Sequence, residues 1–204
     1  MARAREFEED AVLAKAEAVF RQKGFGAATM LDIARASGVQ RGSLYHAYGD
    51  KDALFLRTFD RYEARFLTQA RGALDQADAR QALLTFFDAA IANMSNGPAA
   101  QGCLTTKVAT EAANESKKIA ARVRKLLDAL DGIVAEALAR PALARAIRLP
   151  PPEAARLVVT FTRGLAVMER VYHDPAALRK TAGALVDLLA PPAAAAGSPA
   201  TKKR

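Results

Sequence analysis

The chain has 204 residues, of which 30 are Lys or Arg and 22 are Asp or Glu, for a formal net charge of +8. This length can bury a full core in one or two small domains, and the positive charge suits a nucleic-acid partner. One cysteine and two distant histidines exclude a disulfide framework and offer no metal-ligand spacing, so no metal and no cofactor are expected. No apolar run reaches roughly 18 residues and no signal-peptide core is found, which predicts a cytoplasmic protein without membrane contact.

The positive charge is unevenly distributed along the chain. Residues 1–60 hold nine basic and nine acidic side chains, so total charge does not by itself predict DNA binding there. Placement is more informative, because residues 33–49 contain Arg35 and Arg41 and no carboxylate. A locally positive surface is therefore expected in this stretch.

The first fifty residues predict three helices. An apolar pattern of helical period spans about residues 6–23 and ends at Gly24-Phe25-Gly26. Thr29 and Asp32 have the spacing of a capping box that starts a second, short helix, and Gly38 suits the tight turn that ends it. Two short helices joined in this way form a helix-turn-helix. Five hydrogen-bonding side chains face away from its apolar positions: Gln40, Arg41, Ser43, Tyr45 and His46.

Helical patterns continue through the rest of the chain. Asp50 can cap a long fourth helix that links the helix-turn-helix to the C-terminal part of the chain. Another helix is expected to begin near residue 101, and apolar periodicity predicts helices over about residues 79–95, 115–139, 153–172 and 175–190. The apolar positions of the last two spread wider than one core-facing stripe, so a second buried face is expected there. Residues 191–204 have little to bury and predict a disordered basic tail.

A motif in the second half of the helix-turn-helix resembles a known family. The run Gly42-Ser43-Leu44-Tyr45-His46, with Tyr48, Lys51 and Leu54 after it, resembles the signature of TetR-type transcriptional repressors. The resemblance implies an all-α protein with an N-terminal three-helix DNA-binding domain (1–49) and a C-terminal helical ligand-sensing and dimerisation domain (50–190). It also implies a homodimer through residues 153–190 that binds a near-palindromic double-stranded DNA operator.

The short helix from residue 40 to residue 48 carries the candidate DNA contacts. Arg41 has the geometry to pair with guanine O6 and N7, and Gln40 and Ser43 can read neighbouring bases. By the resemblance, phosphate contacts fall to Tyr45, His46 and Lys51. Thr29 joins them because it lies at a helix N-terminus, where free N–H groups attract the same anion.

Gly102-Cys103-Leu104 is the second informative motif. It resembles a Gly-Cys-Leu sequence in a subgroup of TetR-type repressors that includes sensors of electrophiles and oxidants. A thiol in the first turn of a helix, four residues before Lys107, is expected to have a lowered pKa. Two alternatives stay open: Cys103 is an inert small hydrophobe, or an apolar ligand pocket lies beside it. The candidate pocket residues, which ordinary core packing also explains, are Phe86, Phe87, Met94, Phe161 and Met168.

These observations predict a DNA-binding transcriptional regulator. The expected mode is repression, with release from the operator when a small molecule or a thiol-reactive, oxidising signal reaches the C-terminal domain. A nonspecific DNA-binding helical protein is the first alternative, but it would require basic clusters throughout residues 1–60. A small helical enzyme is the second, and the sequence offers neither a nucleophile with a base nor convergent carboxylates for it. The sequence leaves the inducer and the operator unnamed.

Overall fold

A computed structural model describes residues 2–95, 103–112 and 116–192, and every regular element in these ranges is an α-helix. The chain is therefore all-α, as the sequence predicts. The predicted tail falls almost entirely on residues outside the described ranges. The ten helices described are α1 (Ala2–Ala27), α2 (Met30–Ser37), α3 (Arg41–Tyr48), α4 (Lys51–Leu74), α5 (Ala79–Ser95), α6 (Leu104–Ala112), α7 (Lys117–Leu138), α8 (Pro141–Ala144), α9 (Pro151–Tyr172) and α10 (Pro175–Leu189).

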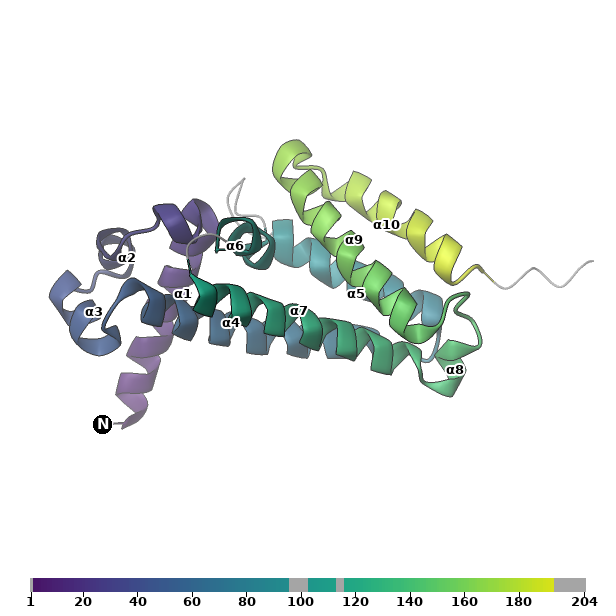
Figure 1. The fold of residues 1–204 in the computed structure, drawn as a ribbon, viewed down its shortest axis with the longest axis horizontal. Helices are drawn as coiled ribbons and strands as arrows, with labels where there is room; N and C mark the ends of the chain where they lie inside the picture. Colours follow the sequence, from purple (N-terminus) through teal and green to yellow (C-terminus); the bar gives the residue numbers. More distant parts are fainter. Residues whose placement is uncertain (1, 96–102, 113–115, 193–204) are drawn as a thin grey trace, which may run out of the picture.

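Helices α1, α2 and α3 form a small unit at one end of the molecule (Figure 1). The predicted capping box is present: the Asp32 N–H donates to the Thr29 hydroxyl over 3.1 Å, and the Thr29 N–H donates to the Asp32 carboxylate over 3.0 Å. Such a cap stabilises a helix by about 0.5–2 kcal/mol. Gly38 ends α2 in the left-handed conformation, with φ of 72°. The turn therefore follows the predicted chemistry, and Leu44 anchors α3 to the core.

Two helical elements differ from the sequence prediction. α1 runs to Ala27, past the expected end, but Gly24 interrupts it with φ 84° and ψ 174°, which are not helical values. The predicted break at Gly24 is thus real, and a short further turn comes after it. The four-residue α8 was not predicted, because Pro141 and the proline run at 150–152 indicated interruptions.

α4 joins the helix-turn-helix unit to the rest of the protein (Figure 1). Asp50 caps it as predicted, accepting the Ala53 N–H over 2.7 Å. One face of α4 carries a row of buried aromatic rings whose neighbouring centroids lie 5.5–5.8 Å apart: Phe55, Phe59, Tyr62 and Phe66. Each ring stabilises the fold by about 1.5–3 kcal/mol through burial. α4 packs against α1, α5 and α7, so it is in contact with both the helix-turn-helix unit and the C-terminal helices.

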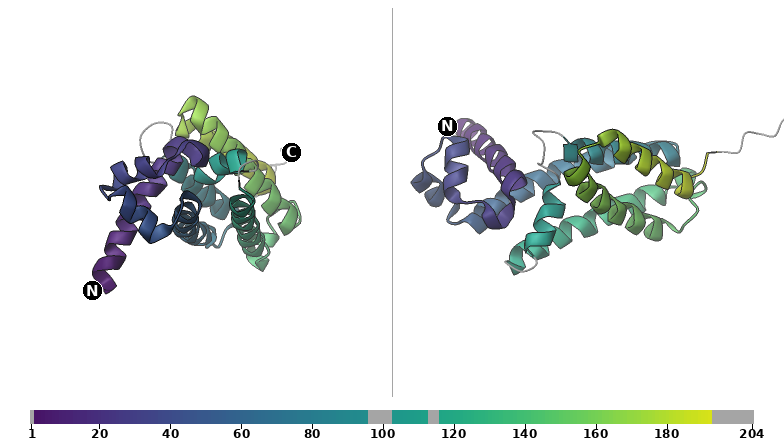
Figure 2. Two further views of the ribbon diagram at one scale, coloured as in Figure 1. Left: turned by 60° about the vertical axis from the view of Figure 1, so that its left-hand side comes forward. Right: turned by 90° about the horizontal axis from the view of Figure 1, so that it is seen from above.

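α9 and α10 lie together along one side of the molecule, where α9 packs on α7 and α10 packs on α5 (Figure 2). Their outer surface keeps large apolar side chains exposed, among them Val171 at 64%, Tyr172 at 70% and Leu188 at 66%. The wide apolar pattern therefore gives an inner, buried face and an outer, exposed apolar face, and the burial of the outer face stays a prediction. Leu165 belongs to the inner face, with only 3% exposed. No helix in the described part of the chain is long and apolar enough to cross a membrane.

Candidate DNA-binding surface and thiol site

The predicted DNA-reading side chains all lie on the exposed side of α3 and its N-cap. Gln40, Arg41, Ser43, Tyr45 and His46 are exposed, whereas Leu44 between them is 1% exposed. The Arg41 guanidinium lies 5.3 Å from the centre of the Tyr45 ring and donates to its hydroxyl over 3.4 Å. This stacking holds the two side chains together on the surface. Ser43 also lines an open hollow of about 920 Å³ between α1 and α3.

Thr29 and Lys51, predicted phosphate contacts, each have a partner within the chain. The Thr29 hydroxyl is part of the capping box. Asp32, its partner there, also accepts a bond from Lys23, and this bond, followed by the Thr29 hydroxyl, lowers the pKa of Asp32 to about 2. The Lys51 ammonium donates to the carbonyl of Phe25 over 2.9 Å and lies 4.4 Å from the Phe25 ring centre. Both residues therefore stabilise the helix-turn-helix unit through contacts within the chain, and their phosphate contacts stay a prediction.

Cys103 lies at the N-terminal end of α6, the helix of the C-terminal part that packs against α1. Its carbonyl accepts the first helical bond, from Lys107 N–H over 3.0 Å, and its side chain is buried. The Tyr62 hydroxyl from α4 lies 3.9 Å from the sulfur, and an Arg163 guanidinium N–H from α9 lies 3.6 Å away. Three helices thus converge on one thiol.

These neighbours favour the thiolate. Burial by itself raises the pKa of the Cys103 thiol, but the Arg163 charge, then the N–H and hydroxyl of Thr106, and then the Tyr62 hydroxyl lower it to about 7. The Tyr62 oxygen already accepts from Thr105 over 3.3 Å and from Asn93 over 3.5 Å. With its acceptor sites used, its own proton is left to point at the sulfur. Burial, followed by the nearby sulfur charge, raises the pKa of Tyr62, so it stays a donor.

The cation beside the sulfur is Arg163, not Lys107 as the sequence suggested. Lys107 points the other way and donates to the carbonyls of Arg21 and Gln22 in α1. The sequence shows Arg156, Arg163 and Arg170 at seven-residue spacing, a pattern more typical of a solvated helix face. No local signal singles out Arg163, because its partner sulfur is 60 positions away in the chain.

The residues predicted to line an apolar pocket differ in their surroundings in the described part of the chain. Phe86, Phe87 and Met94 are core residues with at most 3% exposed. Phe161 meets the Phe87 ring edge-on at 5.7 Å, while Met168 is 49% exposed on the outer face of α9. Phe86 lines a hollow of only about 10 Å³, at the limit for one water molecule. Within the described residues, three or more potential metal ligands gather nowhere.

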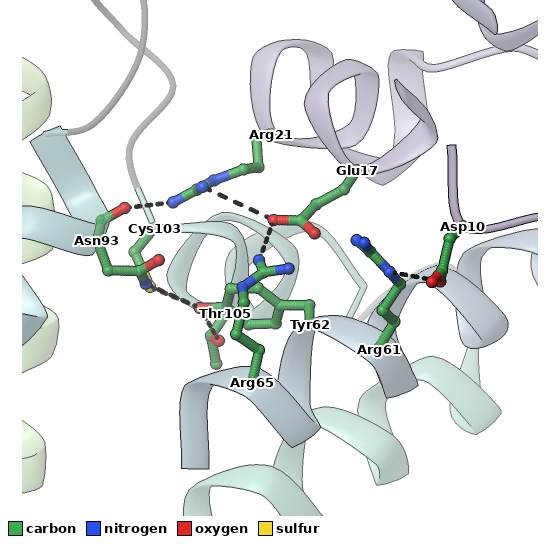
Figure 3. A network of polar contacts seen from close by, with 9 residues as sticks. All are labelled: Asp10, Glu17, Arg21, Arg61, Tyr62, Arg65, Asn93, Cys103 and Thr105. Atoms are coloured by element: carbon green, nitrogen blue, oxygen red, sulfur yellow. Dashed lines mark hydrogen bonds and ion pairs between the residues drawn. The ribbon is translucent and has the colours of Figure 1, made fainter. Parts of the chain in front are cut away.

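A chain of polar contacts leads from the thiol site to α1 (Figure 3). Tyr62 is bonded to Asn93, whose backbone carbonyl accepts from Arg21. Arg21 lies 3.7 Å from Glu17, and the Glu17 carboxylate accepts from Arg65 of α4 over 2.7 Å. Glu17 and Arg21 are both buried, so these charges are paired away from water. The thiol and the first helix are parts of one connected interior.

A short helix-turn-helix unit joined to a larger helical domain places this chain in the class of helix-turn-helix proteins. Residues 12–58 match the family model "Bacterial regulatory proteins, tetR family", and residues 79–185 match "Tetracyclin repressor-like, C-terminal domain". The second match alone spans more than half of the chain. The protein therefore belongs to the TetR family of bacterial regulators, as the motif at residues 42–54 implies.

Individual relatives agree with this assignment. The HTH-type transcriptional repressor ComR of Escherichia coli (strain K12) is 32% identical over 117 residues, which span 56% of this chain and 55% of ComR. Two solved structures share the fold at 20% identity and a TM-score of 0.79 each. The reduced form of E. coli NemR covers 92% of this chain and 99% of its own. A cysteine mutant of the TetR-family regulator CifR, complexed with 26-bp double-strand operator DNA, covers 88% and 95%.

Proposed function

We propose that the protein is a homodimeric transcriptional repressor that binds a near-palindromic operator and is released when Cys103 is modified. The observation that carries DNA binding is the exposed row on α3, in which Arg41 is flanked by hydrogen-bonding side chains and by no carboxylate. Such a helix fits the major groove, where guanine offers Arg two acceptors. ComR bears the name of a repressor, and the CifR structure holds operator DNA. These support the same role and a cytoplasmic location for this chain.

The proposed dimer uses the exposed apolar face of α9 and α10. Val167, Met168, Val171 and Tyr172 leave about half or more of their surface open to water on α9. Two such helix pairs can close into a four-helix bundle, which buries these side chains and sets the distance between two α3 helices. We expect that distance to be about one turn of DNA, roughly 34–36 Å.

The proposed signal is an electrophile or oxidant that reacts at the sulfur of Cys103. A thiolate is the reactive form of cysteine, and its charge here is supported by Arg163 and Tyr62. With no second cysteine in the chain, oxidation would give a sulfenic acid, a mixed disulfide or a bond between subunits. A noncovalent inducer is the other candidate; the hollow beside Phe86, of about 10 Å³, is too small to hold it, so such an inducer would bind elsewhere.

One experiment tests the function as a whole. Selection from random DNA, followed by footprinting at a fixed salt concentration, should yield a site with two half-sites protected by a dimer. Binding to random DNA at the same salt should be weaker by about 10³-fold or more. Equal affinity for both would instead support the alternative of a nonspecific DNA-binding protein. Treatment with a thiol-reactive compound should release the wild type but leave Cys103→Ser bound.

A further inference from the structure

The end of α1 is held by two charged side chains of α6 that lie one helical turn apart. Lys107 is 8% exposed, and its ammonium donates to the carbonyls of Arg21 and Gln22. Glu111 accepts the N–H of Phe25 over 2.8 Å and the N–H of Gly26 over 3.4 Å. α6 therefore contacts the carbonyls before the kink at Gly24 and the N–H groups after it. We call Lys107 and Glu111 the α6 clasp.

The signs of the two charges match the backbone groups that they contact. The carbonyls at the end of a helix carry partial negative charge, which the Lys107 ammonium neutralises. The N–H groups beyond the kink carry partial positive charge, which the Glu111 carboxylate neutralises. Hydrogen bonds of this kind, with one ionised partner, are shorter and about twice as strong as neutral ones. Lys107 therefore lies where the backbone exposes carbonyls, and Glu111 lies where it exposes N–H groups.

Gly24 shows how closely the clasp approaches the backbone. Its φ of 84° lies in the region that favours glycine, and a Cβ at this position would clash with the Glu111 carboxylate. Any other side chain here would displace the Glu111 carboxylate from the backbone N–H groups that it contacts. On the opposite side, Lys51 of α4 donates to the carbonyls of Phe25 and Gly26 over 2.9 and 3.3 Å. The turn that leads into α2 is thus fixed from both α4 and α6.

We propose that Lys107 and Glu111 are positioning residues that set the orientation of the helix-turn-helix unit, and that modification of Cys103 reaches DNA through them. This inference rests on the proposed function. Cys103 precedes α6 directly, and its carbonyl bonds to the Lys107 N–H, so the thiol site and the clasp share one short rigid helix. Because the sulfur is buried against side chains of α4 and α9, we expect a group added to it to push these helices and α6 apart. A displacement of about 1 Å along the bond from the Phe25 N–H to Glu111 lengthens it from 2.8 Å to beyond the range of hydrogen bonding.

The test uses Glu111→Gln and Lys107→Met in the full chain. The first keeps the shape of the side chain and removes its charge; the second keeps the apolar stem and removes the ammonium. Exposed residues on α7 supply matched controls, Glu136→Gln and Lys118→Met. Iodoacetamide is the probe: the Cys103 thiolate displaces iodide from its methylene carbon and forms a thioether. Mass spectrometry measures that reaction in every variant.

Amide hydrogen exchange at Phe25 and Gly26 reports on the clasp without DNA. Exchange there should quicken by at least about threefold in Glu111→Gln and in alkylated wild type, and not in the controls. Operator binding gives the second readout. Alkylation should weaken operator binding by the wild type by about tenfold or more. It should weaken operator binding by Glu111→Gln by less than about threefold, because this variant has already lost part of the coupling between the thiol site and the helix-turn-helix unit. Glu111→Gln retains an acceptor oxygen, so it keeps the test valid if Lys107→Met does not fold.

The outcomes separate the two proposals. Unchanged exchange at Phe25 and Gly26 in alkylated wild type overturns the clasp, whatever happens to DNA binding. Equal release of the wild type and of both clasp variants, at equal extents of alkylation, also overturns it. If the wild type selects no operator while amide exchange at Phe25 and Gly26 still responds to alkylation, the link between Cys103 and the clasp is supported and the proposed repressor function fails.

Discussion

Replacing Arg163 by Met should make Cys103 a poor nucleophile at neutral pH. The Arg163 charge, 3.6 Å from the sulfur, is the strongest of the influences that hold the pKa of this thiol at about 7 instead of its ordinary 9.0. Methionine keeps the packing of the long side chain and removes the charge. Burial, which raises the pKa, is then opposed only by the neighbouring N–H and hydroxyl groups. We expect the pKa to return toward 9 or above.

The size of the effect depends on the thiolate fraction. At pH 7 a thiol of pKa 7 is half ionised, and one of pKa 9 is about 1% ionised, a ratio of about 50. A more basic thiolate is also a better nucleophile, which offsets about eightfold of this ratio over two pKa units. The alkylation rate at pH 7 should therefore fall by about sixfold. The clearer result is a shift of the pH–rate midpoint upward by about two units.

The assay is the rate of iodoacetamide alkylation of Cys103 between pH 5.5 and 10, read by mass spectrometry of the intact protein. Arg124→Met is the matched control, because Arg124 is exposed on α7. The control should keep the wild-type midpoint near 7. A wild-type midpoint above 8, or an Arg163→Met midpoint equal to that of the wild type, would refute the proposed electrostatic activation of the thiol.

The recognition helix, the dimer face and the capping box of α2 can each be tested by one substitution. Arg41→Ala should lose about 1–3 kcal/mol on the operator and relax the preference at one symmetric base pair in a binding titration; an equal loss on all sequences would make Arg41 a phosphate contact. Val171→Glu should place an unpaired charge in the proposed dimer face, so sedimentation should show a folded monomer that no longer binds the operator. An unchanged dimer would move the interface elsewhere. Asp32 should titrate with an NMR midpoint of about 2, and Lys23→Met should raise it; because the folded pKa lies below 3.8, the stabilisation by Asp32 is complete above about pH 4 and is lost as the pH falls toward 2.

The sequence by itself determines the local elements of this protein. Capping boxes, left-handed glycine turns and helical periodicity depend on residues within about four positions of each other. They can therefore be recognised from the amino-acid sequence alone. The pair Thr29 and Asp32 starts α2 where the spacing predicts, and Gly38 ends it. The exposed row on α3 results from the same periodicity. The family motif lies in this local part of the chain, which is why the family could be recognised from it.

Only the tertiary structure decides which distant side chains meet. Arg163 reaches the sulfur of Cys103 from 60 positions away, and Lys107, the near neighbour in sequence, points to α1 instead. On a helix, residues four apart lie on one face, but the neighbouring helices decide which partner each side chain finds. Glu111 and Gly24 likewise meet only because α6 crosses the end of α1. A contact between distant positions has no periodicity and no spacing rule, so it appears only when the helices have packed.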